Sequence, residues 1–346
     1  MNTQQQQYSN QFLSIKRLKG DVEVESFIDR NFSDLITKTA LSSWLSQVQQ
    51  NSSMTPLPDE YLGEAFMRNA QTLPLWADRK RMKNGSRFFV QHAEQIMQLL
   101  GLLSLPYCYA AADGAMVLYL TERLKSNAGK RLTDTAGFIW DVMAPNAFEI
   151  EGKGFASCLK IRLTHAAARY YTLRSGKWDS TLGFPINQED MAGTNLSFSL
   201  IVIRGLRKLG HSISYEEQQS FLHLWNVIGY LLGLEDDLIT QDGKSAHALE
   251  LAIRNRHFKT SEQGSELTRV LISYFDSVTP SNISLKDTHQ LMRYLLGDKI
   301  ANLLNIPNSS IPLYLPYLLK IASHFPNLEH KVSYKQKYNS FIRKTA

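Results

Sequence analysis

Cysteine is scarce in this sequence, since Cys108 and Cys158 are the only two among 346 residues. Two cysteines fifty residues apart do not form a disulfide scaffold, and they cannot supply a cysteine zinc site of the usual kind. They fit a reducing compartment. Residues 1–7 also lack the basic and then apolar segments of a secretory signal. These absences lead us to expect a cytoplasmic protein.

Long apolar runs are also missing. The longest one, residues 99–120, is interrupted by Pro106 and Asp113, whereas a membrane-spanning helix needs about 20 nearly uninterrupted apolar residues. We therefore expect buried helices around a turn and no stable membrane insertion. The 38 basic and 32 acidic residues are spread along the chain, with small basic clusters at 79–83 and 254–259. Nucleic-acid-binding proteins more often concentrate charge in one stripe, so we expect no nucleic-acid partner and leave open a weak contact with an anionic surface.

Several catalytic motifs are absent as well. The chain has no Gly-x-Gly-x-x-Gly, P-loop, His-Glu-x-x-His or Gly-x-Ser-x-Gly sequence. The pair Asp236-Asp237 lacks the third acid of a magnesium-binding prenyl-transfer motif, because Leu238, Ile239 and Thr240 follow. We interpret this pair as the acidic end of a helix.

Apolar residues recur at the spacing of helices, and alternating strand patterns bounded by hairpin turns are few. The fold class is therefore predicted as all-α. Residues 1–20 are expected to be a flexible start. Helices are expected at about 22–50, 59–72, 86–100, 130–143, 155–173, 189–209, 215–232, 244–256, 262–276, 285–304 and 313–324.

The predicted helix 155–173 carries an unusual polar stripe. Phe155, Leu159 and Leu163 lie on its apolar face, and a neighbouring stripe holds Arg162, His165 and Arg169 together with Cys158. Since residues three and four apart are neighbours on a helix, His165 has one arginine a turn before it and another a turn after it. Such a stripe suggests an anionic group beside a titratable or metal-binding ring. A hydrogen-bonded boundary histidine is the ordinary alternative for a single helix.

Several other stretches occur in a fixed order with this stripe. They are Trp76-x-Asp78, Gly129-Lys130-Arg131-Leu132-x-x-Thr135, Arg162-x-x-His165-Ala166-Ala167-x-Arg169, Pro185-Ile186-Asn187-Gln188-Glu189-Asp190 and Trp225-x-x-x-Gly229-Tyr230-Leu231-Leu232-Gly233. Together they resemble the haem-dependent oxygenase family of the rubber-cleaving latex-clearing proteins and the fungal oxygenase of mycophenolic acid biosynthesis. The resemblance covers roughly residues 76–239, and it implies a globin-like helical core with additional helices around it.

The resemblance also implies roles for individual residues. It makes His165 the metal-binding residue, as the proximal ligand of haem b iron, with a second acceptor holding its other ring nitrogen. It places Arg131 and Thr135, which share one helix face, on the distal side, where they would polarise dioxygen. Arg162 and Arg169 would bind the cofactor by pairing with its propionates or by shaping its pocket.

One position departs from the family. Rubber-cleaving members can carry a lysine three residues after the distal arginine, where this chain has Asp134. A carboxylate cannot replace a lysine nitrogen as a ligand. Asp134 is expected to form a salt bridge with Arg131, and a surface position or a proton-donating catalytic role are the alternatives. The departure argues against rubber cleavage itself.

The sequence thus predicts a haem b oxygenase that uses dioxygen to oxidise or cleave a small apolar, unsaturated substrate. The alternatives are a haem protein that senses or carries a gas or haem without turnover, and a helical interaction protein without a cofactor. The expected organisation is a helical extension at 1–70, a haem-binding oxygenase-like domain at 71–330 and a basic tail at 331–346.

Overall fold

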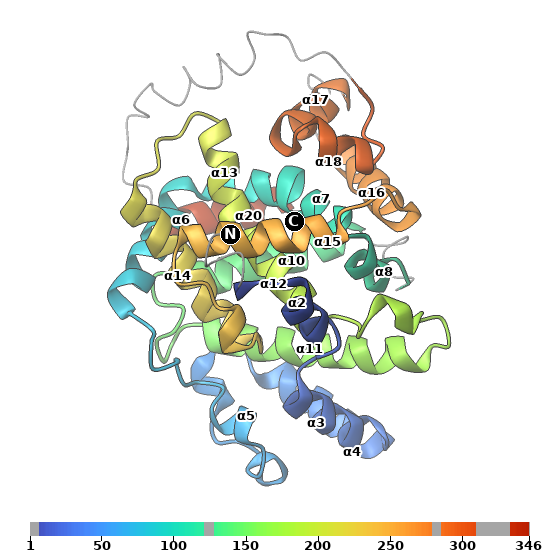
Figure 1. Cartoon of the computed structure of the whole chain (residues 1–346). Helices are drawn as coiled ribbons and strands as arrows, with labels where there is room; N and C mark the ends of the chain where they lie inside the picture. The colour runs from blue at the N-terminus through green and yellow to red at the C-terminus, as the bar shows by residue number, and fades with distance from the viewer. Residues whose placement is uncertain (1–6, 121–127, 279–284, 309–332, 346) are drawn as a thin grey trace.

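The structure is a computed structural model that describes residues 7–120, 128–278, 285–308 and 333–345. Its helices in chain order are α2 (Asn10–Arg17), α3 (Val22–Phe32), α4 (Leu35–Gln47), α5 (Ala65–Arg68), α6 (Arg79–Leu99), α7 (Leu105–Ala110), α8 (Ala112–Leu120), α10 (Ala128–Met143), α11 (Gly154–Arg174), α12 (Gln188–Phe198), α13 (Leu200–Lys208), α14 (Tyr215–Leu231), α15 (Gly243–His257), α16 (Glu262–Val278), α17 (Leu285–Leu296), α18 (Asp298–Leu303) and α20 (Tyr334–Thr345). In Figure 1, α3 to α5 lie at one end and α16 to α18 at the other, with the remaining helices between them.

The predicted all-α fold class is confirmed. Within the described ranges no strand forms, and the nearest approach to one is a single isolated bridge between Ala111 and Phe258. The expected helix 155–173 corresponds to α11, and the expected helix 215–232 corresponds to α14, whose first turn is closed by a capping box of Ser214 and Glu217. Among the helices that the structure describes, none combines the length and the apolar character needed to cross a membrane.

Other predicted helices are shorter or broken. The segment 59–72 forms only a 3-10 turn and the short α5, because Gly63 lies in a turn between them. The expected helix 285–304 is split into α17 and α18 at Gly297, whose φ of 82° favours glycine. The expected helix at 313–324 lies outside the described residues.

The apolar stretch 99–120 shows how the chain accommodates a buried proline. Residues 100–104 form a π-helical turn between α6 and α7, and Pro106 lies in the first turn of α7. Proline is tolerated there because the amide groups of a first helical turn have no partner within the helix. The predicted break at Pro106 is therefore a widened helical turn, and the chain stays buried through it.

Helices α6 and α14 pack closely along one another in the centre of the molecule. A β-carbon added at Gly85 of α6 would lie 2.6 Å from the carbonyl oxygen of Ser220 on α14. Glycine at this position therefore lets the two backbones approach. Both helices contribute buried phenylalanines to the core, among them Phe88 of α6 and Phe221 of α14, whose ring centroids are 5.0 Å apart.

Residues 8–20 form α2 and packed turns, in contrast to the flexible start that we expected for residues 1–20. Helix α2 packs against α12 and α15, and α3 packs against α11. Leu13 of α2 is fully buried, and Lys16 is bonded to Glu235 and lies 2.5 Å from Asp237. These partners are more than 200 residues away in the chain, so local sequence patterns do not reveal them.

Arg17 joins this segment to the core through a buried cluster of charges. Its guanidinium lies 3.0 Å from Asp190, 3.6 Å from Glu189 and 3.8 Å from Asp113. His257 completes the cluster, since its Nε2 lies 2.9 Å from Glu189 and its Nδ1 lies 3.5 Å from Asp113. Burial alone would lower the pKa of His257, but these two carboxylates outweigh burial and raise it.

The basic C-terminal tail contains helix α20, which packs against α6 and α10. The hydroxyl of Tyr334 donates a hydrogen bond of 2.5 Å to the carbonyl oxygen of Trp140, and the rings of Tyr334 and Tyr338 both contact Trp140. Lys337 donates a bond of 2.7 Å to the carbonyl oxygen of Val90, close to a residue of α6, His92, with non-helical backbone angles. The last part of the chain thereby covers the outer side of α10.

We expect Arg17→Ala to lower the free energy of unfolding by about 3 kcal/mol or more, because it leaves the largely buried carboxylate of Asp190 without its cation. Lys259→Ala is the control, since Lys259 also pairs with Asp113 but its side chain is 58% exposed, and such a pair contributes about 1 kcal/mol or less. Urea unfolding followed by circular dichroism measures both. Equal losses for the two variants would contradict the importance of the Arg17 cluster.

Candidate functional site

The histidine of the polar stripe is half-buried on α11 and has no hydrogen-bond partner in the described part of the chain. The Nδ1 atom of His165 is inaccessible to solvent and unbonded. Burial lowers the pKa of His165 to about 3, and the positive charge of Arg169 lowers it in the same direction. The imidazole is therefore neutral at physiological pH and keeps a lone pair available for a ligand. The second acceptor that we predicted for this ring is not found among the described residues.

Arg162, one turn before the histidine, is paired with the N-terminal segment. Its Nε and Nη2 atoms donate to the two carboxylate oxygens of Asp21 at 2.5 and 2.9 Å. A β-carbon on Gly233, whose φ is 91°, would lie 2.9 Å from the Nε of Arg162. Glycine at this position therefore lets the backbone after α14 lie against the ion pair of Arg162 and Asp21. This two-bond arrangement holds α11 against the residues that precede α3.

Arg169, one turn after the histidine, is almost completely buried and is also held by protein groups. Its Nε and Nη2 atoms donate to the carbonyl oxygen of Ile186 at 3.0 and 2.8 Å, and its Nε lies 3.4 Å from Glu25. Burial lowers the pKa of Arg169, although Glu25 opposes this. These contacts let both arginines position α11, but the Nη1 of Arg169 is buried without a hydrogen-bond partner among the described residues. The roles predicted for Arg162 and Arg169 at the cofactor therefore stay predictions.

The two residues predicted for the distal side lie together on α10. Arg131 and Thr135 line a small cavity between α10, α7 and α16, whose other walls are Leu105, Tyr109, Leu132, Leu267, Val270 and Leu271. The Nη1 atom of Arg131 is buried and has no hydrogen-bond partner. An unpaired guanidinium nitrogen beside a hydroxyl in an apolar enclosure can bind a group that is negatively charged or becomes so.

Helices α10 and α11 pack against each other, so the structure brings the two predicted halves of the site onto neighbouring elements. Cys108 of α7 lies within the electrostatic influence of both Arg131 and Asp190. The charge of Arg131 lowers the pKa of its thiol, and that of Asp190 raises it. Burial is the dominant effect and raises the pKa of the Cys108 thiol to about 11. Cys108 is therefore a protonated core residue at physiological pH, in agreement with its lack of a motif.

Asp134 points away from this cavity. Its side chain is 63% exposed, and its carboxylate lies 2.7 Å from the Nζ of Lys130 one turn earlier on α10. The expected salt bridge with Arg131 does not form, because the Asp134 carboxylate pairs with Lys130 while the Arg131 side chain lines the cavity. The structure favours the surface alternative for Asp134, and we do not assign it a catalytic role.

The charged cluster around Glu189 was missed from the sequence. The Asn187-Gln188-Glu189-Asp190 element was recognised only as part of a pattern, and the side chain of Glu189 is fully buried among Arg17, Arg256 and His257. Two adjacent acids at the start of a helix usually serve its N-terminus. The local sequence alone does not distinguish this helix-capping role of Glu189 and Asp190 from ion pairs with residues of α2 and α15.

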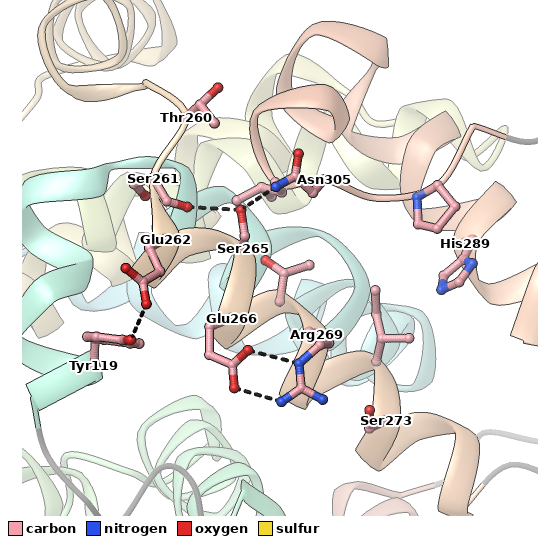
Figure 2. A pocket seen from close by; sticks show the side chains of 14 residues that line it. Tyr119, Thr260, Ser261, Glu262, Ser265, Glu266, Arg269, Ser273, His289 and Asn305 are labelled. Carbon is pink, nitrogen blue, oxygen red and sulfur yellow. Dashed lines mark hydrogen bonds and ion pairs between the residues drawn. The ribbon is translucent and has the colours of Figure 1, made fainter.

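A larger open groove lies on the other side of α16, between α8, α16 and the chain around α17 and α18. Figure 2 shows that several of its polar side chains pair with one another: Tyr119 with Glu262, Arg269 with Glu266, and Asn305 with Ser265. In the described ranges, no group of three or more His, Cys, Asp or Glu side chains is arranged to hold a metal ion. The predicted site residues His165, Arg131 and Thr135 lie on two helices that pack against each other, and their joint role stays a prediction.

We expect His165 to stay neutral where an ordinary histidine is protonated. At pH 6 the ring nitrogens of cofactor-free, histidine-labelled protein should show a neutral His165 and a protonated His257 in NMR spectra. Because unfolded His165 takes up a proton below about pH 6.5, this group also lowers stability as the pH falls from there towards 3. Titration of His165 near pH 6.5 would contradict its burial.

Comparison with known proteins adds a family to this geometry. A family model described as ER-bound oxygenase mpaB/B'/Rubber oxygenase, catalytic domain, matches residues 90–315. Rubber oxygenase from Streptomyces sp. (strain K30) is 24% identical over 277 residues, which are 79% of this chain and 67% of that protein. The solved structure of latex clearing protein LCP in the closed state covers 95% of this chain and 90% of its own, with a TM-score of 0.76 and 22% identity.

The structural likeness shows a shared helical fold over almost the whole chain, since its identity is low. The family model spans more than half of the 346 residues and includes α10 and α11 in full. The chain therefore belongs to the family of the mpaB-type and rubber oxygenases, and it is an oxygenase.

Proposed function

We propose that this oxygenase binds haem b through His165 and uses dioxygen to oxidise or cleave a small apolar, unsaturated substrate. The observation that carries the proposal is the state of His165: a neutral imidazole, half-buried on a helix that is held by ion pairs at both sides, with no hydrogen bond to any described residue. The bound haem supplies a redox-active iron at which dioxygen is activated.

The state of the ring fits the requirement of a metal ligand. An imidazole must be unprotonated to donate its lone pair, and burial together with Arg169 keeps the pKa of His165 near 3. A buried polar atom without a partner costs about 1–3 kcal/mol. A ligand that accepts the imidazole lone pair would therefore bind to a group that is already desolvated.

The fixed arginines support the same interpretation. Arg162 ties α11 to Asp21, and Arg169 ties it to the carbonyl oxygen of Ile186. These bonds flank His165 by one turn on each side and restrain the rotation of α11. A restrained ligand is better positioned for chemistry than one on a mobile element.

On α10, Arg131 and Thr135 supply a charge and a hydroxyl in an enclosure that is otherwise mainly apolar. There the unpaired guanidinium nitrogen of Arg131 would stabilise negative charge that develops on oxygen, and Thr135 would donate or accept a hydrogen bond. Leu105, Leu267 and Leu271 line this space, and both interactions are stronger in an apolar surrounding than in water.

The walls of this cavity support an apolar substrate. We do not propose rubber, which the name of the Streptomyces relative indicates for that protein. The position of the lysine found in rubber-cleaving relatives is taken here by Asp134, which faces solvent and pairs with Lys130.

We expect His165→Ala to abolish stable haem binding, because no other described side chain near this part of α11 is an unpaired imidazole. Absorption spectra of the oxidised and reduced proteins, expressed with an adequate haem supply, would show a strong Soret band for the wild type and its loss in the variant. His247→Ala, at an exposed histidine on α15, is the matched control and should keep the wild-type spectrum.

A second variant separates ligand loss from misfolding. His165→Gly should also lose the band, and added imidazole should restore it by occupying the vacated space. An unchanged spectrum in His165→Ala would overturn the assignment of the ligand. A wild-type protein that takes up no haem would overturn the proposed cofactor.

A further inference from the structure

The loop before α6 holds an apolar residue away from the protein. Leu75 is fully exposed and Trp76 is 39% exposed, although both belong to a well-anchored segment. The ring of Trp76 contacts His223 at 5.8 Å and Tyr230 at 6.0 Å between centroids. The backbone amide of Asp78 also donates a bond of 2.8 Å to the Nε2 of His223. Leu75 is therefore presented to solvent by a fixed loop.

The helix that follows begins with an excess of positive charge. Its first half carries five exposed cations, which are Arg79, Lys80, Arg81, Lys83 and Arg87. Cations are disfavoured in the first turn of a helix because the positive end of its dipole lies there. Cations at this end lower the stability of α6, and an anionic partner would offset this unfavourable interaction.

Most of this charge is available to such a partner. Arg79 lies 3.4 Å from Glu149, and Arg81 lies 3.7 Å from Asp78. In contrast, Lys80, Lys83 and Arg87 form no ion pair within the described ranges, and their spacing of three and four places them on one side of α6. Five cations and the three exposed anions Asp78, Glu149 and Glu151 leave a local charge of +2.

A further exposed apolar residue joins the group. The contact between Arg79 and Glu149 brings Ile150, which is 65% exposed, beside the start of α6. We call the surface formed by Leu75, Trp76, Ile150 and the cations of α6 the Leu75 face. In Figure 1 the chain that leads from α5 into α6 runs along the outer edge of the molecule, away from α16 to α18.

We propose that the Leu75 face docks on the surface of an anionic lipid bilayer. Lysine and arginine side chains are attracted to acidic headgroups, while the exposed Leu75, on a loop that Trp76 anchors, enters the boundary between headgroups and acyl chains. A polyanion such as nucleic acid would use the cations but offers nothing to a fully exposed leucine. Docking beside a bilayer would also give an apolar substrate a short route to the enzyme, and this last point alone rests on the proposed function.

The experiment uses the full chain and sedimentation with vesicles of phosphatidylcholine alone or with 30% phosphatidylserine (roughly the acidic fraction of a strongly anionic leaflet). We expect sedimentation with the acidic vesicles only, weakened by added salt because salt screens the cations. Lys80→Glu/Lys83→Glu should reduce the partition coefficient at least about tenfold. Leu75→Ser should reduce it several-fold at unchanged charge.

Matched controls carry the same changes elsewhere. Lys177→Glu/Lys299→Glu changes the net charge equally at exposed lysines away from the Leu75 face, and Ile36→Ser removes another exposed apolar side chain. Both should bind as the wild type does. Equal loss in the two double variants would overturn the proposal, because only net charge would then matter.

Two further results would also overturn it. One is a wild-type protein that stays in the supernatant with acidic vesicles at low salt. The other is binding that is insensitive to Leu75→Ser and is matched by equally strong binding to duplex DNA, which would indicate a general polyanion site. All of these measurements are independent of the haem spectrum, so failure here leaves the proposed function untouched.

Discussion

The ion pair between Arg162 and Asp21 is the contact on which the site depends most. It joins α11, near the middle of the chain, to the residues that precede α3, and Gly233 at the end of α14 leaves the space that it occupies. Arg169 makes the corresponding contact with Ile186 a turn beyond the histidine. With both arginines fixed, His165 is held in a desolvated position, where no described residue gives its Nδ1 atom a hydrogen bond.

This dependence explains why the N-terminal segment is folded onto the oxygenase core. Asp21 follows α2 directly, and α2 is secured by Arg17 within the buried charges of α8, α12 and α15. The cluster of Arg17 and the pair of Arg162 and Asp21 therefore hold neighbouring parts of the same segment. On the other side, α20 covers α10 through Trp140, so the helix of Arg131 and Thr135 is also restrained from outside.

The sequence predicts what is local. The period of apolar residues predicted the fold class, the extent of α11 and the range of α14. The polar stripe identified His165 because a helix places every third or fourth residue together. Asp21 and Ile186 were not predictable as partners of the stripe, since an arginine on a helix boundary has the same pattern whether it meets solvent, a cofactor or a distant carboxylate. The packing of α2 was not predictable for the same reason. The partner of Asp134 was also not predictable, because its spacing to Arg131 and to Lys130 allows either pair.

A crystal structure of the haem-loaded protein tests the central claim most directly, namely that α10 and α11 together form one cofactor site. The account predicts a ring nitrogen of His165 bonded to the iron, with Arg131 and Thr135 facing the opposite side of the same haem. Arg162 and Arg169 should keep Asp21 and Ile186 as partners. A haem held by another residue, or one that lies away from Arg131 and Thr135, would contradict it.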